Sequence, residues 1–129
     1  MQTEWYEYDE ESDVLEIYFD DRRPAWTIEL TPNIMVSIDR VTQQPVQLTL
    51  LDYVELVRLT DEGPQSFPIT GLASLPVEER RLVMQVLMAP PLNRWLDVST
   101  VQSLPDSPFT VAHVEPPPQA LRALVPVFA

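Results

Sequence analysis

The sequence has no cysteine, no lysine, a single histidine and only two glycines. Without cysteine there can be no disulfide, no thiolate metal site and no cysteine nucleophile. Gly63 and Gly71 cannot build a glycine-rich phosphate loop, a dinucleotide fingerprint or a GxSxG elbow, and His113 alone excludes an imidazole-rich metal cage within one chain. These absences exclude most cofactor-dependent enzyme families, and we expect no cofactor.

Long apolar runs are also absent. No stretch approaches the roughly 18 apolar residues of a membrane helix, and the N-terminus MQTEWYEYDEE has neither a basic nor an apolar signal region. Because 20 acidic residues outweigh 8 basic ones, the formal charge is -12, which disfavours nucleic acids and anionic membranes as partners. We therefore expect a soluble, cytoplasmic protein that binds neither nucleic acid nor membrane.

What is present is ordinary for a globular chain. The composition is 45% hydrophobic and 22% charged, and the length of 129 residues suits a single domain spanning residues 1–129. A chain of this size can bury roughly two-thirds of the surface that it exposes when unfolded. A core that is stable without disulfides is therefore feasible.

The first 51 residues alternate between apolar and polar side chains with the period of β-strands. Turn sequences such as DEESD, DRRPA, TPN and RVTQQP separate the alternating segments. The apolar positions that should share one face are Leu15, Ile17, Phe19, Trp26, Ile28, Leu30, Ile34, Val36, Ile38, Val46, Leu48 and Leu50. This pattern predicts an antiparallel meander of about five strands with one face in water.

Helical spacing begins after this region. In DYVELVRL, Asp52 and Glu55 have capping-box spacing and favour a short helix, although a continued strand over 53–59 is an alternative. After the loop TDEGPQSFPITG, the pattern predicts the main helix at about 75–89, capped by Ser74 and ended by Pro90.

The main helix has an unusually wide apolar surface. Glu78, Arg81 and Gln85 form one narrow polar stripe, and the apolar side chains cover nearly all the remaining surface. Two explanations stay open. The helix either lies between the sheet and the C-terminal segment, or it exposes Met84, Leu87 and Met88 as a homodimer interface.

Beyond the helix, NRWLDVSTV and FTVAHVE have strand-like compositions, and the prolines between residues 105 and 126 suggest an arm lying across the surface. The predicted fold is therefore α+β: the sheet, the main helix packed on one of its faces, and a proline-rich C-terminal segment.

Two segments resemble a bacterial family known as domain of unknown function 2283. YDEESDVLEIYF is similar to the family's opening, and NIMVSIDRVTQQPVQLTLLDY to its second half, with Asp39, Thr42 and Val46 at the characteristic positions. The chain departs from the pattern at Gln47, where relatives usually have glycine. The resemblance covers residues 4–53 as a β core, and residues 72–129 form a helical, proline-rich extension similar to that of longer relatives. It implies a compact sheet with a helix and no established activity.

The acidic turn offers candidate metal ligands. Asp9, Glu10, Glu11 and Asp13 supply hard oxygens of the kind that calcium and magnesium prefer. The stretch lacks the central glycine of an EF-hand loop, and acidic residues are also common in solvated hairpin turns. A cation site and a plain turn are the two interpretations.

Other candidates are fewer. Tyr6, Tyr8 and Tyr18 on neighbouring strands could form an aromatic patch for a protein partner, or simply occupy half-buried sheet positions. Glu16 could pair with Glu29 or Asp39 as a general acid and base, but alternation puts these residues on the wet face of the sheet. His113 fits a packed or surface histidine better than a catalytic one.

The sequence thus favours a non-enzymatic interaction or regulatory module that acts as a homodimer. A divalent-cation-binding protein or cation-dependent hydrolase using the acidic turn is the first alternative. An acidic inhibitor of a basic protein, suggested by the charge of -12, is the second.

Overall fold

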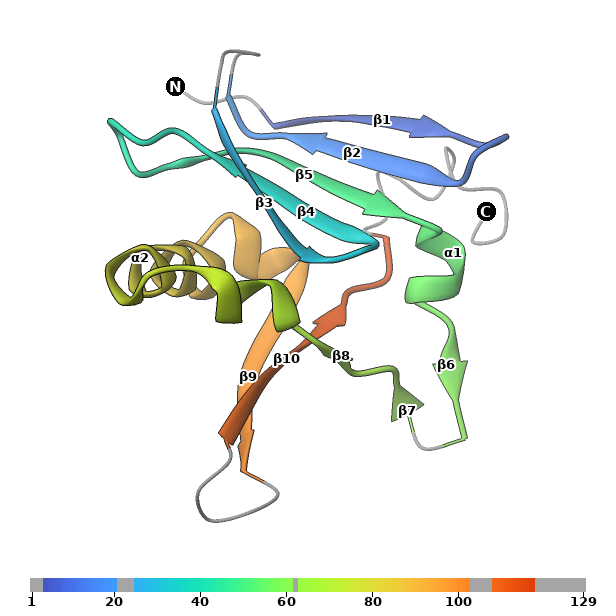
Figure 1. Ribbon diagram of the computed structural model, residues 1–129. Helices are drawn as coiled ribbons and strands as arrows, with labels where there is room; N and C mark the ends of the chain where they lie inside the picture. The colour runs from blue at the N-terminus through green and yellow to red at the C-terminus, as the bar shows by residue number, and fades with distance from the viewer. Residues whose placement is uncertain (1–3, 21–24, 62, 103–107, 118–129) are drawn as a thin grey trace.

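A five-stranded antiparallel sheet forms the first layer of the molecule (Figure 1). The computed structural model describes residues 4–20, 25–61, 63–102 and 108–117. The strands are β1 (Trp5–Asp9), β2 (Val14–Tyr18), β3 (Trp26–Thr31), β4 (Ile34–Ile38) and β5 (Pro45–Leu51), in the order β1-β2-β5-β4-β3. The five antiparallel strands expected from the sequence are confirmed.

Within the sheet the chain forms two runs of consecutive strands, β1-β2 and β3-β4-β5, which meet where β2 pairs with β5. Leu15 lies opposite Leu50 and Ile17 lies opposite Leu48 in this pairing. Because a shift of one residue would turn one apolar stripe to the other face, the burial of both stripes fixes this register.

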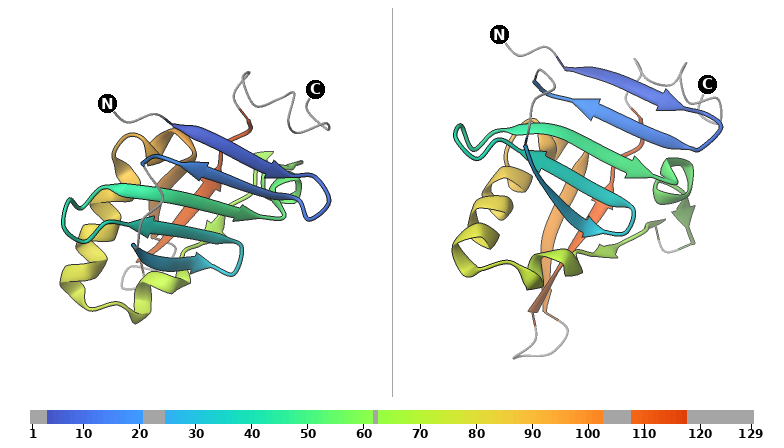
Figure 2. Two further views of the ribbon diagram at one scale, coloured as in Figure 1. Left: turned by 90° about the horizontal axis from the view of Figure 1, so that it is seen from above. Right: turned by 45° about the horizontal axis from the view of Figure 1, so that its top comes forward.

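The described part of the chain that follows β5 lies on one side of this sheet (Figure 2). It contains α1 (Tyr53–Leu56), the short strands β6 (Leu59–Thr60), β7 (Gly63–Pro64) and β8 (Phe67–Pro68), the 3-10 helix η1 (Thr70–Ser74), α2 (Val77–Met88), the 3-10 helix η2 (Leu92–Arg94), β9 (Leu96–Gln102) and β10 (Pro108–Val114). β8, β10 and β9 form a three-stranded sheet in that order, and β6 pairs with β7. The α+β class with one main helix is confirmed, and none of the helices within the described ranges is long and apolar enough to cross a membrane.

The core lies between the sheet and this second layer. Its sheet side is the predicted apolar stripe, and its other side comes from α1, η1, α2, η2, β9 and β10. Trp26 is only half-buried at the margin of this core, whereas Tyr53, Leu87 and Leu96 are fully buried within it. At about 25 cal/mol per Å² of apolar area, a side chain of this kind contributes about 1.5–3 kcal/mol when buried.

Val46 departs from the predicted stripe. It is buried, but it lies outside the core cluster and lines a shallow hollow with Tyr18 and Ser37. The pairing register shifts between Ser37 and Ile38, which leaves Val46 at a bulge. A bulge adds a residue and so turns the following side chain to the opposite face.

Both predicted helix caps are wrong. Asp52 adopts the left-handed conformation and makes no capping bond to α1, and Ser74 lies in η1, where its hydroxyl donates to the carbonyl of Gly71. α2 begins at Val77, after Pro76, because proline keeps the preceding Leu75 extended. The helix at 53–56 resolves the choice left open by the sequence, with strand β6 following at Leu59.

The predicted C-terminal arm is wrong in part. Residues 108–114 form a regular strand against β9, and the side chains of Ala112 and Val114 bury in the core. The strands expected in NRWLDVSTV and FTVAHVE are therefore confirmed. Residues 118–129, which contain the remaining part of the proline-rich segment, lie outside the described residues, and the single domain spanning 1–129 stays a prediction.

Candidate functional site

The acidic turn between β1 and β2 uses its carboxylates to hold the backbone. Asp9 accepts hydrogen bonds from the backbone N–H of Glu11 at 3.0 Å and of Ser12 at 3.4 Å. Asp13 accepts from the Tyr8 hydroxyl at 2.6 Å and from the backbone N–H of Val54 at 3.1 Å. Asp13 therefore does for α1 what the sequence assigned to Asp52.

The proposed metal ligands do not converge. Asp9, Glu11 and Asp13 are not brought together, and Glu10 and Glu11 project into solvent. Across the described ranges, no group of three histidine, aspartate or glutamate side chains has a geometry that could hold a metal ion. The turn is built as a structural connection between the sheet and α1.

The three candidate tyrosines do not form one patch, because Tyr6 and Tyr8 pack against the core while Tyr18 points to the opposite face of the sheet. Tyr6 lies against Trp95 with ring centroids 5.5 Å apart, whereas Tyr18 stacks on Trp5 at 5.2 Å. Their partners in the ladder, Ile17 for Tyr6 and Trp5 for Tyr18, show the alternation directly. Period-two alternation separates residues 6 and 8 from residue 18 once the register is known.

Tyr8 is fixed by its surroundings. Burial, followed by the hydrogen bond to Asp13 and the negative charge of that carboxylate, raises the pKa of Tyr8 above its ordinary value. Burial likewise raises the pKa of Tyr6, with a further increase from Glu4. These two tyrosines are neutral structural groups at physiological pH.

Other carboxylate candidates are also dispersed. Glu16 lies opposite Glu7 on β1 and Thr49 on β5, and it accepts a hydrogen bond from the Tyr18 hydroxyl. Glu29 is on edge strand β3, beyond β5 and β4, so it cannot pair with Glu16. Asp39 accepts from the backbone N–H groups of Val41 and Thr42 and holds the β4–β5 turn.

The candidate interface residues on α2 differ in how far their side chains are exposed. Leu87 is fully buried in the core and offers no exposed surface in the folded chain. Met84 is partly buried and Met88 is 59% exposed. Packing against the core therefore uses much of the apolar surface that suggested a homodimer, because this side of the helix lies in the core cluster against η2 and β9.

An apolar hollow that no sequence pattern predicts lies between α1 and the end of β10, and we call it the α1–β10 hollow. Its volume is about 200 Å³. The apolar lining is Leu56, Val57, Leu59, Pro64, Val114 and Pro116, and the polar rim is Gln65, Asp97, His113 and Glu115. These residues come from five separate stretches of the chain, so no local pattern could reveal them.

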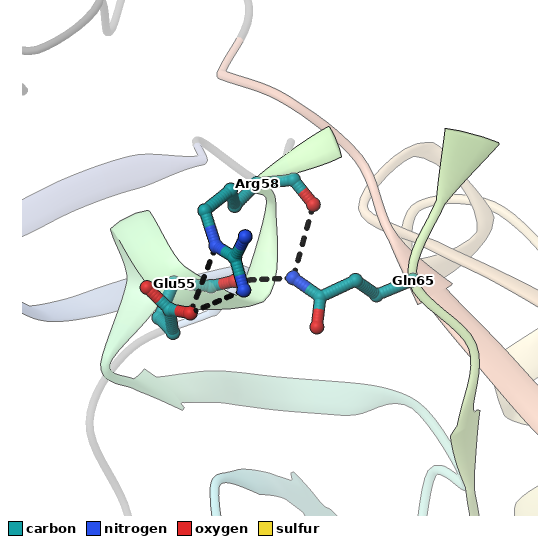
Figure 3. Close-up of polar contacts among 3 residues, drawn as sticks. All are labelled: Glu55, Arg58 and Gln65. Carbon is teal, nitrogen blue, oxygen red and sulfur yellow. Dashed lines mark hydrogen bonds and ion pairs between the residues drawn. The ribbon is translucent and has the colours of Figure 1, made fainter. Parts of the chain in front are cut away.

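The wall of this hollow is held by one glutamine (Figure 3). The side-chain amide of Gln65 donates to the backbone carbonyls of Glu55 at 2.7 Å and Arg58 at 3.0 Å. Arg58 in turn forms an exposed ion pair of 2.8 Å with Glu55. Two of the last carbonyls of the α1 segment are thereby satisfied, which fixes β7 and the following residues against α1.

The opposite wall is tied to the core. Tyr53 is fully buried and its hydroxyl donates to the backbone carbonyl of Glu115 at 3.2 Å. The backbone N–H of Glu115 donates to the carbonyl of Trp95 at 2.9 Å. These bonds hold the chain in place just beyond β10, so the hollow is largely pre-formed.

At the rim, His113 Nε2 and Ser66 Oγ share a hydrogen bond of 3.0 Å. Asp97 lies directly opposite His113 in the β9–β10 ladder, but its carboxylate makes no hydrogen bond or ion pair with any residue in the described ranges. A serine nucleophile needs a base that a third group holds in position. Among the described residues, the rim therefore provides polar groups without a completed triad.

The residues that match a known family are those of the five-stranded sheet. Residues 5–52 match the family model described as Protein of unknown function (DUF2283). The match begins at the first residue of β1 and ends at Asp52, immediately before α1, so the resemblance expected from residues 4–53 is confirmed. No curated protein and no solved structure matches the chain.

The DUF2283 match contains none of the residues that line the α1–β10 hollow, since all of them follow residue 52. The similarity of residues 72–129 to extensions on longer DUF2283 relatives stays a prediction. Any function of the hollow must be argued from its own geometry.

Proposed function

We propose that the protein is a non-enzymatic interaction module that binds a segment of a partner protein in the α1–β10 hollow. The segment carries one apolar anchor side chain with basic residues beside it. The observation that carries this proposal is an apolar lining beneath a rim that includes the carboxylates of Asp97 and Glu115. In this proposal the module acts by holding its partner, as a regulatory or inhibitory subunit would.

The size of the hollow supports a single anchor. A dry cavity of about 150 Å³ is sufficient for a benzene ring, so about 200 Å³ accommodates one aromatic or branched side chain. Small-molecule sites usually range from about 300 to 1,000 Å³. Protein interfaces commonly depend on a few anchors in desolvated pockets, and Leu59, which is 70% exposed, extends the apolar surface beyond the hollow.

The negative charge of the chain supports the proposal that the bound segment is basic. The formal charge of -12 attracts cationic partners and increases their association rate, particularly at low salt. Close to the hollow, Arg58 is already paired with Glu55, whereas the Asp97 carboxylate makes no hydrogen bond or ion pair within the described ranges. An arginine or lysine that follows the anchor can therefore pair with Asp97.

The test uses fluorescein-labelled peptides in which arginines surround one central phenylalanine. Anisotropy titrations compare this probe with a peptide that has glycine at the centre and with one that has glutamates in place of the arginines. Both changes should weaken binding, since one removes the anchor and the other reverses the charge. Equal binding of the phenylalanine and glycine peptides would show charge attraction alone and would sink the proposal.

Variants locate the site. Asp97→Asn and Leu59→Ser alter exposed side chains and should leave the fold intact, while each weakens binding of the phenylalanine peptide about fivefold or more. Asp61→Asn is the matched control, because Asp61 is exposed and lies outside the hollow. A similar loss in Asp61→Asn and Asp97→Asn would mean that only net charge matters.

A homodimer is the second candidate. Among the described residues, three of the four strongly exposed large apolar side chains, Val41, Val77 and Met88, lie on α2 or on the β4–β5 turn beside it. The ion pair of 3.5 Å between Arg40 and Glu79 joins that turn to α2. We propose that two copies meet on this surface. Light scattering after size exclusion should find a dimer that Met88→Ser weakens, and a strict monomer at tens of micromolar would contradict it.

A further inference from the structure

A second hollow, of about 330 Å³, lies between η1, α2 and β10, and we call it the η1–α2 hollow. Its apolar lining includes Ile69, Leu72 and Met84, and Arg80 is its only charged residue. The volume is at the lower end of the range for small-molecule sites. Residues of β8, η1, α2 and β10 meet here, and none of them belongs to the α1–β10 hollow.

The guanidinium of Arg80 is held in place by backbone carbonyls. Its Nε–H donates to the carbonyl of Leu72 at 3.2 Å, and one N–H of Nη2 donates to the carbonyl of Leu75 at 3.0 Å. A guanidinium has five N–H donors in a fixed plane. The two carbonyls therefore orient the group and leave three donors, both on Nη1 and one on Nη2, for other acceptors.

No carboxylate neutralises Arg80 within the described ranges. Arg40, Arg58 and Arg94 each form an ion pair with a glutamate, at 3.5, 2.8 and 3.7 Å respectively. Arg80 is exposed, and the polar partners of its guanidinium are the two carbonyls, in a chain where acids outnumber bases 20 to 8. An oriented cation beside an apolar wall is a suitable receptor for an anion with an apolar body.

We propose that the η1–α2 hollow binds a small organic monocarboxylate with an aliphatic or aromatic tail. The carboxylate accepts two parallel hydrogen bonds from Nη1 and Nη2 of Arg80, the edge of the guanidinium that the backbone carbonyls leave available. The tail lies against Ile69, Leu72 and Met84. The hydroxyl of Thr70 or Thr110 at the margin supplies a further donor.

The many acidic residues of the chain do not strongly disfavour a carboxylate ligand beside Arg80. Glu78 and Glu79 lie in the first turn of α2, near Arg80 in sequence, but Glu79 is paired with Arg40. At physiological ionic strength, charges separated by more than about 8 Å are largely screened. Carboxylates of the chain beyond that distance are therefore largely screened, and a ligand carboxylate in direct contact with the guanidinium is governed mainly by Arg80.

The test is a titration of ¹⁵N-labelled protein with 4-phenylbutyrate, followed by amide chemical shifts at constant ionic strength. The expected result is saturable shifts centred on residues 69–73 and Thr110. The alcohol 4-phenylbutanol, which keeps the tail and loses the charge, should bind at least about tenfold more weakly, since a bidentate charged pair is lost. Equal binding of the alcohol, or no shift with 10 mM 4-phenylbutyrate, roughly the weak limit for a ligand of this size, would overturn the proposal.

Variants separate a binding role from a structural one. Arg80→Gln should weaken 4-phenylbutyrate about tenfold or more. Arg81→Gln, at the exposed neighbouring position, should change the affinity less than twofold. Undiminished binding to Arg80→Gln would contradict the site. If loss of the two carbonyl contacts unfolds that variant, Met84→Glu replaces it, because a glutamate four residues after Arg80 supplies the carboxylate internally and should block the ligand.

Discussion

The hydroxyl of Tyr8 donates a hydrogen bond of 2.6 Å to the carboxylate of Asp13, five residues later and at the other end of the β1–β2 turn. The same carboxylate accepts the backbone N–H of Val54 at the start of α1. Asp13 also has a positive φ of 55°, a conformation that aspartate tolerates better than most residues. One acidic side chain thereby closes the hairpin and caps the helix that follows the sheet.

Removing this carboxylate should destabilise the fold. Asp13→Ala leaves the Tyr8 hydroxyl and the Val54 N–H without their acceptor, and we expect a loss of about 1–3 kcal/mol in the free energy of unfolding. Urea denaturation measures it. Glu10→Gln, in the same turn and exposed, should stay within about 0.5 kcal/mol.

A double-mutant cycle isolates the pair. Tyr8→Phe and Asp13→Asn should each cost stability, and their combined cost should be smaller than the sum by about 0.5–3 kcal/mol. Strict additivity would show that the contact contributes nothing.

Alkaline pH should unfold the protein through Tyr53. Burial, followed by the negative charges of Asp13 and Glu115, raises the pKa of Tyr53 above its ordinary value near 10. The folded state keeps this proton while the unfolded state loses it, so stability is complete below pH 10 and falls as the pH rises beyond it. The expected slope is about 1.4 kcal/mol per pH unit for this tyrosine. Unfolding free energies between pH 8 and 11.5 test it, and Tyr53→Phe, although less stable at pH 8, should fall less steeply.

Gly71 marks a close contact between η1 and the edge of the sheet. A Cβ at this position would lie 1.8 Å from the carbonyl oxygen of Glu29 and 3.1 Å from that of Leu30, so β3 would have to move. We expect Gly71→Ala to cost about 3 kcal/mol, at the upper end of overpacking penalties. At Gly63 a Cβ meets nothing within 4 Å, and the positive φ of 104° is the only strain. Thermal unfolding should therefore show a smaller loss for Gly63→Ala, and the reverse order would contradict this account.

Divalent cations should not stabilise the native state through the acidic turn. Asp9 and Asp13 already serve as acceptors for the protein's own donors, and the remaining acids of the turn point to solvent. A site with a Kd of about 10 µM would add about 2.7 kcal/mol at 1 mM metal, which is a readily measured increase in Tm. Calcium, magnesium and manganese at 1 mM, compared at matched ionic strength, should give no such increase. An increase in Tm that Asp9→Asn removes would instead support a cation site in the turn.

Much of the sheet could be predicted because its signals are local. Leu15, Ile17 and Leu48 alternate with polar neighbours, and such alternation produces a buried face in whatever sheet the strand joins. The sequence places the start of the main helix within about two residues, with Ser74 as its cap, whereas Pro76 makes Val77 the first helical residue. Proline geometry decided between two plausible local signals.

The candidate sites could not be predicted to the same extent. Tyr6 and Tyr18 occupy opposite faces of the sheet in the β1–β2 register, and Leu87 is buried in the core, and local spacing reveals neither placement. At the two hollows, Gln65 donates to a carbonyl of α1, and Arg80 donates to the carbonyls of Leu72 in η1 and of Leu75. A periodic pattern contains no information about such partners.

By itself the sequence determined the α+β class, the apolar face of each strand, the main helix and the resemblance of the sheet to a known family. Those properties depend on side-chain spacing within a few residues. Tertiary structure alone decided that β2 pairs with β5, that Asp13 caps a helix 41 positions away at Val54, and that two apolar hollows receive their polar groups. Contacts between distant segments depend on which surfaces fit together once the loops are closed, and residue order along the chain does not specify that fit.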